Sequence, residues 1–234
     1  MIGVYDYTVI LTYLSLISGS LGILVSLHGY GHPYVGVFFL LACGLCDAFD
    51  GKVARTKKNR TVLEKSFGVQ VDSLADLVCF GVLPASIGMA MLRTSEKFSD
   101  APIINETTNK RDWYVVLLFI IAVLYVLAAL IRLAYFNATE DERNKELAET
   151  GKMSYTGLPV TSAALIFPFV VLLHFFTRFD FSIIYFVTMF LVSILFLGKF
   201  KMKKISGGAL YILILVGVVE FVLLLLFKFL VFKD

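Results

Sequence analysis

The chain has 234 residues, of which 59% are apolar and 17% are charged, and its formal net charge at pH 7 is +3. The mean hydropathy is +0.84. This composition excludes an ordinary water-soluble domain and is typical of an integral membrane protein. The three cysteines, Cys43, Cys46 and Cys79, lie in or beside apolar segments, so we predict packed thiols in preference to a disulfide framework or a redox pair.

Seven apolar stretches are long enough for membrane helices, each of which needs about 20 mostly apolar residues. The predicted spans are residues 9–27, 34–50, 68–92, 113–136, 157–176, 181–198 and 208–232. The predicted fold is therefore all-α, a polytopic transmembrane helical bundle that forms one integral membrane domain over residues 1–234. No basic region precedes the first stretch, so we expect a retained membrane helix and not a cleaved signal peptide. The charged segment 139–152 is predicted to contain a short surface helix.

Lysine and arginine gather in alternate loops, after the second, fourth and sixth spans. These residues are Lys52, Arg55, Lys57, Lys58, Arg60, Lys65, Arg143, Lys145, Lys152, Lys199, Lys201, Lys203 and Lys204. Because cytoplasmic loops carry an excess of Lys and Arg, we predict that these three loops face the cytoplasm.

Four carboxylates lie where the second span ends and the third begins: Asp47, Asp50, Asp72 and Asp76. The first two are three residues apart and the last two are four apart, so each pair shares one face of a helix. Carboxylates that converge near a bilayer cannot all stay ionised without cations. The pattern therefore predicts a site for hard divalent cations, either Mg²⁺ or Mn²⁺. A bound ion that only holds two helices together is the alternative.

Small residues continue the two carboxylate faces. Gly51 and Ala54 follow Asp47, and Gly68 precedes Asp72 by one turn. Such residues let two helix backbones approach closely. Arg55 comes one turn after Gly51, where its guanidinium could meet a phosphate.

The pattern Asp47-x-x-Asp50-Gly51-x-x-Ala54-Arg55, followed by Gly68-x-x-x-Asp72-x-x-x-Asp76, resembles the signature of the CDP-alcohol phosphotransferases. These integral membrane enzymes join a CDP-activated group to an alcohol and release CMP. The resemblance implies a six-helix core over about residues 9–198, an extra C-terminal helix at about 208–232, and a homodimer. Twelve residues separate Arg55 from Gly68, more than in many members, and we expect the added residues to lengthen an exposed turn.

The resemblance implies roles for the signature residues. All four aspartates would be metal ligands, and Asp76 would also be the general base. The nucleotide and its diphosphate would be bound by Thr12, Ser15, Asp47, Gly51, Ala54, Arg55, Gly68 and Asp72. For the two hydroxyl residues of the first span, hydrogen bonding to their own helix is an equal alternative.

Two further segments resemble the serine branch of the family, IRLAYFN at residues 131–137 and KMSYTGLP at residues 152–159. The resemblance implies an acceptor site formed by Arg132, Asn137, Lys152 and Ser154. A serine carboxylate needs a cation, which Arg132 or Lys152 could supply. The same cations would suit glycerol 3-phosphate or an inositol compound, and Arg132 could instead be a membrane-edge arginine that extends to the interface.

The expected function is transfer of the phosphatidyl group of CDP-diacylglycerol, or of a CDP-linked ether lipid, to L-serine with release of CMP. A cation transporter that uses the aspartates as its ion site is an alternative from another class. The enzyme is favoured because the acids lie near one membrane surface beside Arg55, which would repel a permeating cation. The expected location is the cell membrane, with the active site near the cytoplasmic face; the partners are membrane lipids and the two substrates, with no nucleic acid.

Overall fold

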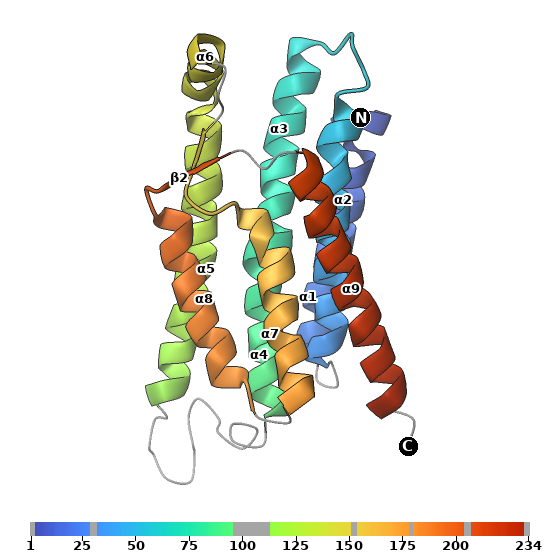
Figure 1. The fold of residues 1–234 in the computed structure, drawn as a ribbon, viewed down its shortest axis with the longest axis vertical. Helices are drawn as coiled ribbons and strands as arrows, with labels where there is room; N and C mark the ends of the chain where they lie inside the picture. Colours follow the sequence, from blue (N-terminus) through green and yellow to red (C-terminus); the bar gives the residue numbers. More distant parts are fainter. Residues whose placement is uncertain are drawn as a thin grey trace.

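The computed structural model describes residues 3–28, 32–95, 113–150, 154–177, 180–203 and 207–231. Its long helices lie side by side in one bundle (Figure 1). The helices are α1 (Ile10–Leu27), α2 (Pro33–Ala54), α3 (Val62–Asp76), α4 (Leu83–Thr94), α5 (Trp113–Ala138), α6 (Glu140–Thr150), α7 (Ala163–Thr177), α8 (Ser182–Leu197) and α9 (Gly207–Val231). Shorter elements are the 3₁₀ turns η1 (Tyr7–Val9) and η3 (Val160–Ser162), the π-helical turn η2 (Leu77–Val82), and the strands β1 (Ser154–Thr156) and β2 (Lys201–Lys203).

Each predicted span corresponds to a helix, and the predicted polytopic bundle is confirmed. Within the described residues, four helices are long and apolar enough to cross a membrane: Tyr7–Leu27, Pro33–Ala54, Val62–Thr94 and Trp113–Ala138. Three shorter apolar helices cover Val160–His174, Ser182–Leu197 and Tyr211–Leu226. Large apolar side chains are exposed along their outer faces, for example Leu24 at 67% and Val123 at 66%. A bilayer would cover such faces, because soluble proteins rarely expose apolar patches of this extent.

The third span begins six residues earlier than predicted, at Val62 instead of residue 68. The cause is a capping box. The Thr61 hydroxyl accepts a hydrogen bond from the Glu64 N–H at 3.2 Å, and the Glu64 carboxylate accepts one from the Thr61 N–H at 2.7 Å. Both bonds satisfy N–H groups that a helix start leaves without partners. The helix therefore extends beyond the apolar segment into the polar region.

The third span is one continuous rod of α3, η2 and α4, with a π-helical turn in the middle. Pro84 has no N–H to offer the carbonyl of Phe80 one turn earlier. The buried Tyr125 hydroxyl of α5 donates to that carbonyl at 2.6 Å, and the buried Tyr185 hydroxyl of α8 donates to the Pro84 carbonyl at 2.8 Å. Two tyrosines on other helices thus stabilise the irregular turn that immediately follows Asp76.

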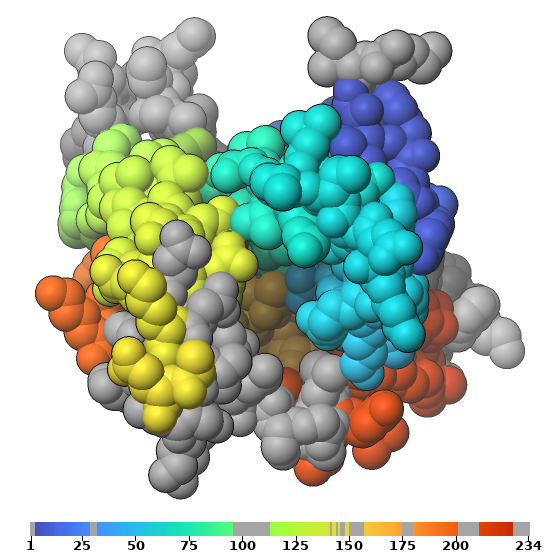
Figure 2. All heavy atoms as spheres, turned by 90° about the horizontal axis from the view of Figure 1, so that it is seen from above, coloured from blue at the N-terminus to red at the C-terminus, as the bar shows by residue number. Residues whose placement is uncertain are grey.

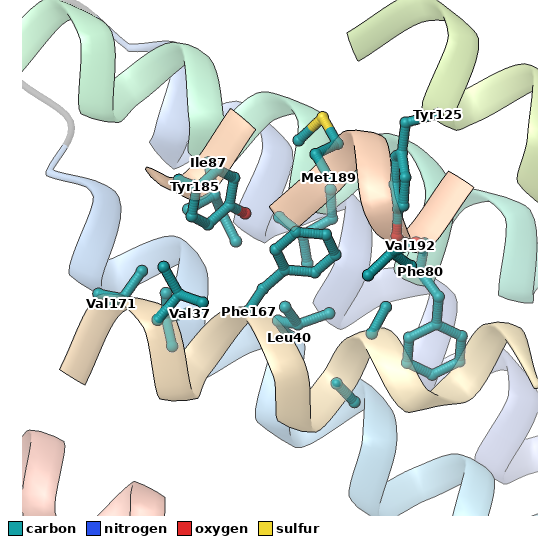
Figure 3. Packing of buried hydrophobic residues seen from close by; sticks show 14 of the residues in the cluster. Val37, Leu40, Phe80, Ile87, Tyr125, Phe167, Val171, Tyr185, Met189 and Val192 are labelled. Carbon is teal, nitrogen blue, oxygen red and sulfur yellow. Dashed lines mark hydrogen bonds between the residues drawn. The ribbon is translucent and has the colours of Figure 1, made fainter. Parts of the chain in front are cut away.

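Aromatic rings join α5, α7 and α8 into one buried cluster (Figure 3). The Phe167 ring lies 5.4 Å from the Tyr125 ring and 4.9 Å from the Tyr185 ring, measured between centroids. The last helix, α9, packs on α2 and α7, where the Phe221 ring meets the Phe38 ring edge-on at 5.3 Å. The Glu220 side chain of α9 is also buried, at 5% exposure.

The two strands pair antiparallel, with Tyr155 opposite Met202, a feature that the sequence did not predict. Each has only three residues, so the class remains all-α. The turn after β1 depends on Gly157, whose φ of +76° lies in the left-handed region that favours glycine. This turn and Pro159 delay the fifth span, which was predicted from residue 157, so that the 3₁₀ turn η3 begins at Val160 and α7 begins at Ala163. The predicted surface helix in segment 139–152 is present as α6.

The three basic loops lie at one end of the bundle. The turn between α2 and α3, helix α6 and strand β2 all lie toward the end that is uppermost in Figure 1. Figure 2 looks onto this end and shows a hollow between the α2–α3 segment and α5. The basic loops therefore share one side of the bundle, as predicted.

Candidate active site

Three carboxylates meet between α2 and α3. Asp47 and Asp50 come from the last part of α2, and Asp72 comes from α3. One carboxylate oxygen from each lies within 4.8 Å of the others, and all three side chains are partly buried. Helical spacing brings the pair on α2 to one face, and Asp72 of α3 lies opposite that face. Three convergent carboxylate oxygens are a donor set that fits Mg²⁺ or Mn²⁺.

Asp76 is not among the three gathered carboxylates, although the sequence led us to expect four together. It is the last residue of α3, one turn beyond Asp72 and directly before the π-helical turn. Four residues of helix advance about 6 Å along the axis. Asp76 therefore lies one turn farther into the bundle than Asp72, on the same helix face.

A pocket of about 200 Å³ opens beside the carboxylates, between η1, α1, α2 and α3. Six of the residues predicted to bind nucleotide and diphosphate line it: Thr12, Gly51, Ala54, Arg55, Gly68 and Asp72. Asp50 lines it as well. The pocket thus combines acidic groups, a guanidinium and small residues, as the signature pattern predicted.

The two signature glycines leave room for arginine side chains. A Cβ atom at Gly51 would lie 3.4 Å from Arg55 Nη1, and one at Gly68 would lie 2.7 Å from Arg60 Nη2. The second distance is too short for any side chain. A residue larger than glycine at position 68 would require the Arg60 guanidinium to shift.

Ser15 faces the interior of the bundle and does not line the pocket. Its carbonyl accepts hydrogen bonds from the thiols of Cys43 at 3.3 Å and Cys79 at 3.2 Å. Its hydroxyl lies 3.4 Å from the Cys79 sulfur. Ser15 and the two cysteines therefore join α1, α2 and η2 directly beneath the carboxylates, and the predicted packing of these thiols is confirmed.

The predicted acceptor residues occupy different places. Arg132 is buried, at 6% exposure, and donates through Nε to the Leu158 carbonyl at 3.1 Å and through Nη2 to the Gly157 carbonyl at 3.3 Å. It thereby holds the turn that precedes α7. Asn137 Nδ2 donates to Ser73 Oγ at 2.7 Å and so connects α5 to α3 beside Asp72. Lys152 lies outside the described residues, and Ser154 is in β1, where only the backbone is described.

Five pocket residues were not predicted: Thr8, Val9, Arg60, Lys65 and Val69. Arg60 and Lys65 belong to the stretch that was expected to lengthen an exposed turn. The turn is largely exposed, as expected, but the half-buried Arg60 side chain lines the pocket, and so does Lys65, an exposed residue of α3. Their positive charge was visible in the sequence, but we used it only to predict that this loop faces the cytoplasm.

An ion pair with two acids holds this turn. Lys57 Nζ lies 2.8 Å from Asp6 Oδ2 and 2.8 Å from Glu64 Oε1. The hydrogen bond from Lys57 lowers the pKa of Asp6, and the same bond raises the pKa of Lys57. A further hydrogen bond of 3.3 Å joins the Thr56 hydroxyl to the Tyr7 hydroxyl. The segment before α1, the α2–α3 turn and the start of α3 are thus connected around the pocket.

A family model described as CDP-alcohol phosphatidyltransferase matches residues 8–219. The chain belongs to this family. The match includes all the signature residues and about the first half of α9.

Curated proteins related to the chain carry names from the serine branch. The chain is 34% identical over 144 residues to the CDP-diacylglycerol–serine O-phosphatidyltransferase of Saccharomyces cerevisiae. The aligned region covers 60% of this chain and 43% of the yeast protein. The chain is 30% identical over 155 residues to the enzyme of the same name from Mycobacterium leprae, covering 66% of this chain and 43% of that protein. It is also 30% identical over 198 residues to the archaetidylserine synthase of Methanothermobacter thermautotrophicus, covering 85% of this chain and 70% of that protein.

The chain thus aligns with less than half the length of the yeast and mycobacterial proteins and with about two thirds of the archaeal one. No solved structure matches the chain significantly.

Proposed function

We propose that this protein transfers the phosphatidyl group of a CDP-linked lipid to L-serine and releases CMP. The observation that carries the proposal is the group of three carboxylates, within 4.8 Å of one another, next to a pocket that also presents Arg55. The names of the relatives support serine as the acceptor. The lipid is CDP-diacylglycerol or a CDP-linked ether lipid, since both present the same CDP end.

The metal site of this proposal consists of Asp47, Asp50 and Asp72, with Asp76 as a further ligand from the same helix face. Their carboxylate oxygens suit Mg²⁺ or Mn²⁺. When bound, such a cation supplies neutralisation of the charge on the diphosphate and on the departing phosphate of CMP.

The protein's own residues bind and orient the nucleotide. Gly51, Ala54, Gly68 and Thr12 line the pocket in which the cytidine nucleotide would bind. Arg55 provides a guanidinium that can bind a phosphate through two hydrogen bonds.

Asp76 is the general base of the proposal. Its carboxylate accepts the hydroxyl proton of serine while the serine oxygen attacks the phosphorus that bears the lipid. A new P–O bond to serine forms as the P–O bond to CMP breaks, and CMP leaves with its phosphate. The transfer is direct, without a covalent intermediate on the enzyme.

The acceptor would enter through the hollow between the α2–α3 segment and α5 that Figure 2 shows. Asn137 lies on that side, hydrogen bonded to Ser73. Arg132, Lys152 and Ser154 remain candidates for binding the serine carboxylate. In this proposal the hollow faces the cytoplasm, where serine and the CDP-lipid headgroup are accessible.

An acceptor panel tests the function. Purified protein is incubated with CDP-diacylglycerol, Mg²⁺ and, in turn, L-serine, glycerol 3-phosphate and inositol 1-phosphate, and CMP release is measured. We expect release with serine only. Release with glycerol 3-phosphate alone would preserve the chemistry and change the acceptor. No release with any alcohol, together with metal-ion flux into proteoliposomes, would support the transporter alternative instead.

A further inference from the structure

The turn between α2 and α3 brings a second arginine to the pocket that the family signature does not contain. We propose that Arg60 binds the diphosphate of the CDP-linked lipid together with Arg55, and that Lys57 is a positioning residue that holds Arg60 there. The identity of the ligand rests on the proposed function. The assignment of Arg60 rests on the contacts of its guanidinium.

The Arg60 guanidinium lies against the bare backbone of α3. Its Nη2 atom is 2.7 Å from the position where a Cβ of Gly68 would be, and both residues line the pocket with Asp50 and Asp72. Arg55 lies over Gly51 on the opposite helix in the same way, at 3.4 Å. The two guanidinium groups thus flank the pocket, one above each signature glycine.

Most of the hydrogen-bonding capacity of Arg60 is unused by the protein. Nη2 donates to the Glu64 carbonyl at 3.2 Å, whereas Nε is buried and has no partner within the described residues. Among the residues that the structure describes, no carboxylate forms an ion pair with Arg60 or Arg55, although Asp50 and Asp72 line the same pocket. A buried donor on a charged group is costly unless an anion satisfies it. A diphosphate diester carries two negative charges, which two guanidinium groups match.

Lys57 holds the turn from which Arg60 extends. Its two ion pairs connect the turn to Asp6 before α1 and to Glu64 in the first turn of α3. The carbonyl of the same Glu64 accepts the hydrogen bond from Arg60. Lys57 does not line the pocket, so its effect on the ligand must pass through the position of Arg60.

The first experiment compares Arg60→Gln with Lys58→Gln. Lys58 lies in the same turn, is exposed and does not line the pocket, so its variant controls for loss of one positive charge. Binding of CDP to the purified full chain with Mn²⁺ is measured by calorimetry, and KM is measured for CDP-diacylglycerol and for serine. We expect Arg60→Gln to weaken CDP binding and raise KM for CDP-diacylglycerol by about 10- to 100-fold, the scale of a charged hydrogen bond. KM for serine and all values for Lys58→Gln should stay within about twofold of the wild type, the spread that neutral surface changes produce.

Unchanged CDP affinity in Arg60→Gln, with normal CMP release by the wild type, would overturn the role of Arg60 and leave the proposed function intact. A wild-type protein that neither binds CDP nor releases CMP with any alcohol would overturn the proposed function itself. The unfolding temperature of each variant in detergent is recorded. If Arg60→Gln is unfolded, Arg60→Lys replaces it, and we then expect weaker CDP binding because lysine lacks the two-pronged geometry.

Lys57→Met tests the positioning role. We expect it to raise KM for CDP-diacylglycerol while kcat changes little, and to have no further effect on CDP affinity when combined with Arg60→Gln. Such non-additivity is the mark of residues that act through one another. Additive losses of affinity would show that Lys57 acts independently of Arg60 and would overturn its positioning role.

Discussion

At the scale of single residues, the three gathered carboxylates should be individually essential. Asn is nearly isosteric with Asp but removes the charge on which binding of a hard cation depends. We expect Asp47→Asn or Asp72→Asn to abolish CMP release and to weaken Mn²⁺ binding, while the protein still inserts into the membrane. Calorimetry with Mn²⁺ and a CMP assay check this, with the exposed Glu142→Gln of α6 as the control. Near-normal turnover in either aspartate variant would remove the carboxylates from the mechanism.

Asp76 should behave differently from its neighbours, because it lies outside the group of three and is proposed to accept a proton. We expect Asp76→Asn to retain CDP binding but to lose serine-dependent CMP release by about 10²- to 10⁴-fold, the usual contribution of a general base. A second readout is exchange of labelled CMP into CDP-diacylglycerol without any alcohol product, which direct transfer forbids. Exchange under these conditions would instead indicate a covalent lipid–phosphoryl enzyme.

At the scale of elements, the π-helical turn after Asp76 depends on a tyrosine from another helix. Removing the Tyr125 hydroxyl leaves the buried Phe80 carbonyl without the donor that Pro84 cannot replace. We expect Tyr125→Phe to lower the free energy of unfolding by about 1–3 kcal/mol, the cost of one unsatisfied buried group. Thermal unfolding in detergent measures this effect, with the exposed Tyr135→Phe on the same helix as the control. Equal unfolding temperatures for the two variants would contradict the role of the bond.

The ion pair between Asp6 and Lys57 predicts how attachment of the N-terminal segment varies with pH. The pKa of Asp6 is lowered in the folded protein. The ion pair therefore stabilises the attached N-terminal segment fully at pH values above the unfolded pKa of about 3.9, and this stabilisation is lost as the pH falls through the folded pKa. The pKa of Lys57 is raised in the folded protein. Its stabilising contribution is therefore complete at pH values below the unfolded pKa of about 10.4 and is lost as the pH rises through the folded pKa.

The substitution Asp6→Asn tests this pH dependence, because Asn removes the charge while keeping an oxygen that can accept the bond from the Tyr7 N–H. We expect faster hydrogen exchange over residues 3–9 in the variant than in the wild type at pH 7. The difference should begin to shrink as the pH falls below about 3.9 and should vanish only below the lowered folded pKa, where Asp6 is protonated in the wild type as well. A difference that is the same at acidic and neutral pH would exclude the charge as its cause.

At the scale of the whole molecule, the bundle has one basic end and the pocket lies toward it. The positive-inside rule predicts that this end faces the cytoplasm. A cysteine introduced at Lys58 should therefore react with an impermeant reagent only from the cytoplasmic side, and one at Asn105 only from outside. Labelling is done on inverted and right-side-out vesicles. The reverse pattern would place the pocket on the outer side and overturn the proposed route of the CDP-linked lipid.

The sequence by itself determined the membrane class, the approximate spans and the chemistry of the signature. These features are local, because about 20 apolar residues make a span and spacings of three or four residues place Asp47 with Asp50 on one helix face. The end of α2 and the start of α3 also follow from short-range signals, although the capping box at Thr61 was recognised only in the structure.

Only the tertiary structure decided which residues surround the pocket and what they contact. It brought Asp47, Asp50 and Asp72 together, placed Ser15 against the cysteines, and placed Arg132 against the backbone carbonyls before α7. It also folded a basic turn back so that Arg60 lies over Gly68. The physical reason is that helix-to-helix register and ion pairs such as Lys57 with Asp6 join residues far apart in the chain. Hydrophobic periodicity specifies which face of a helix is buried, but not which side chain of another helix meets it.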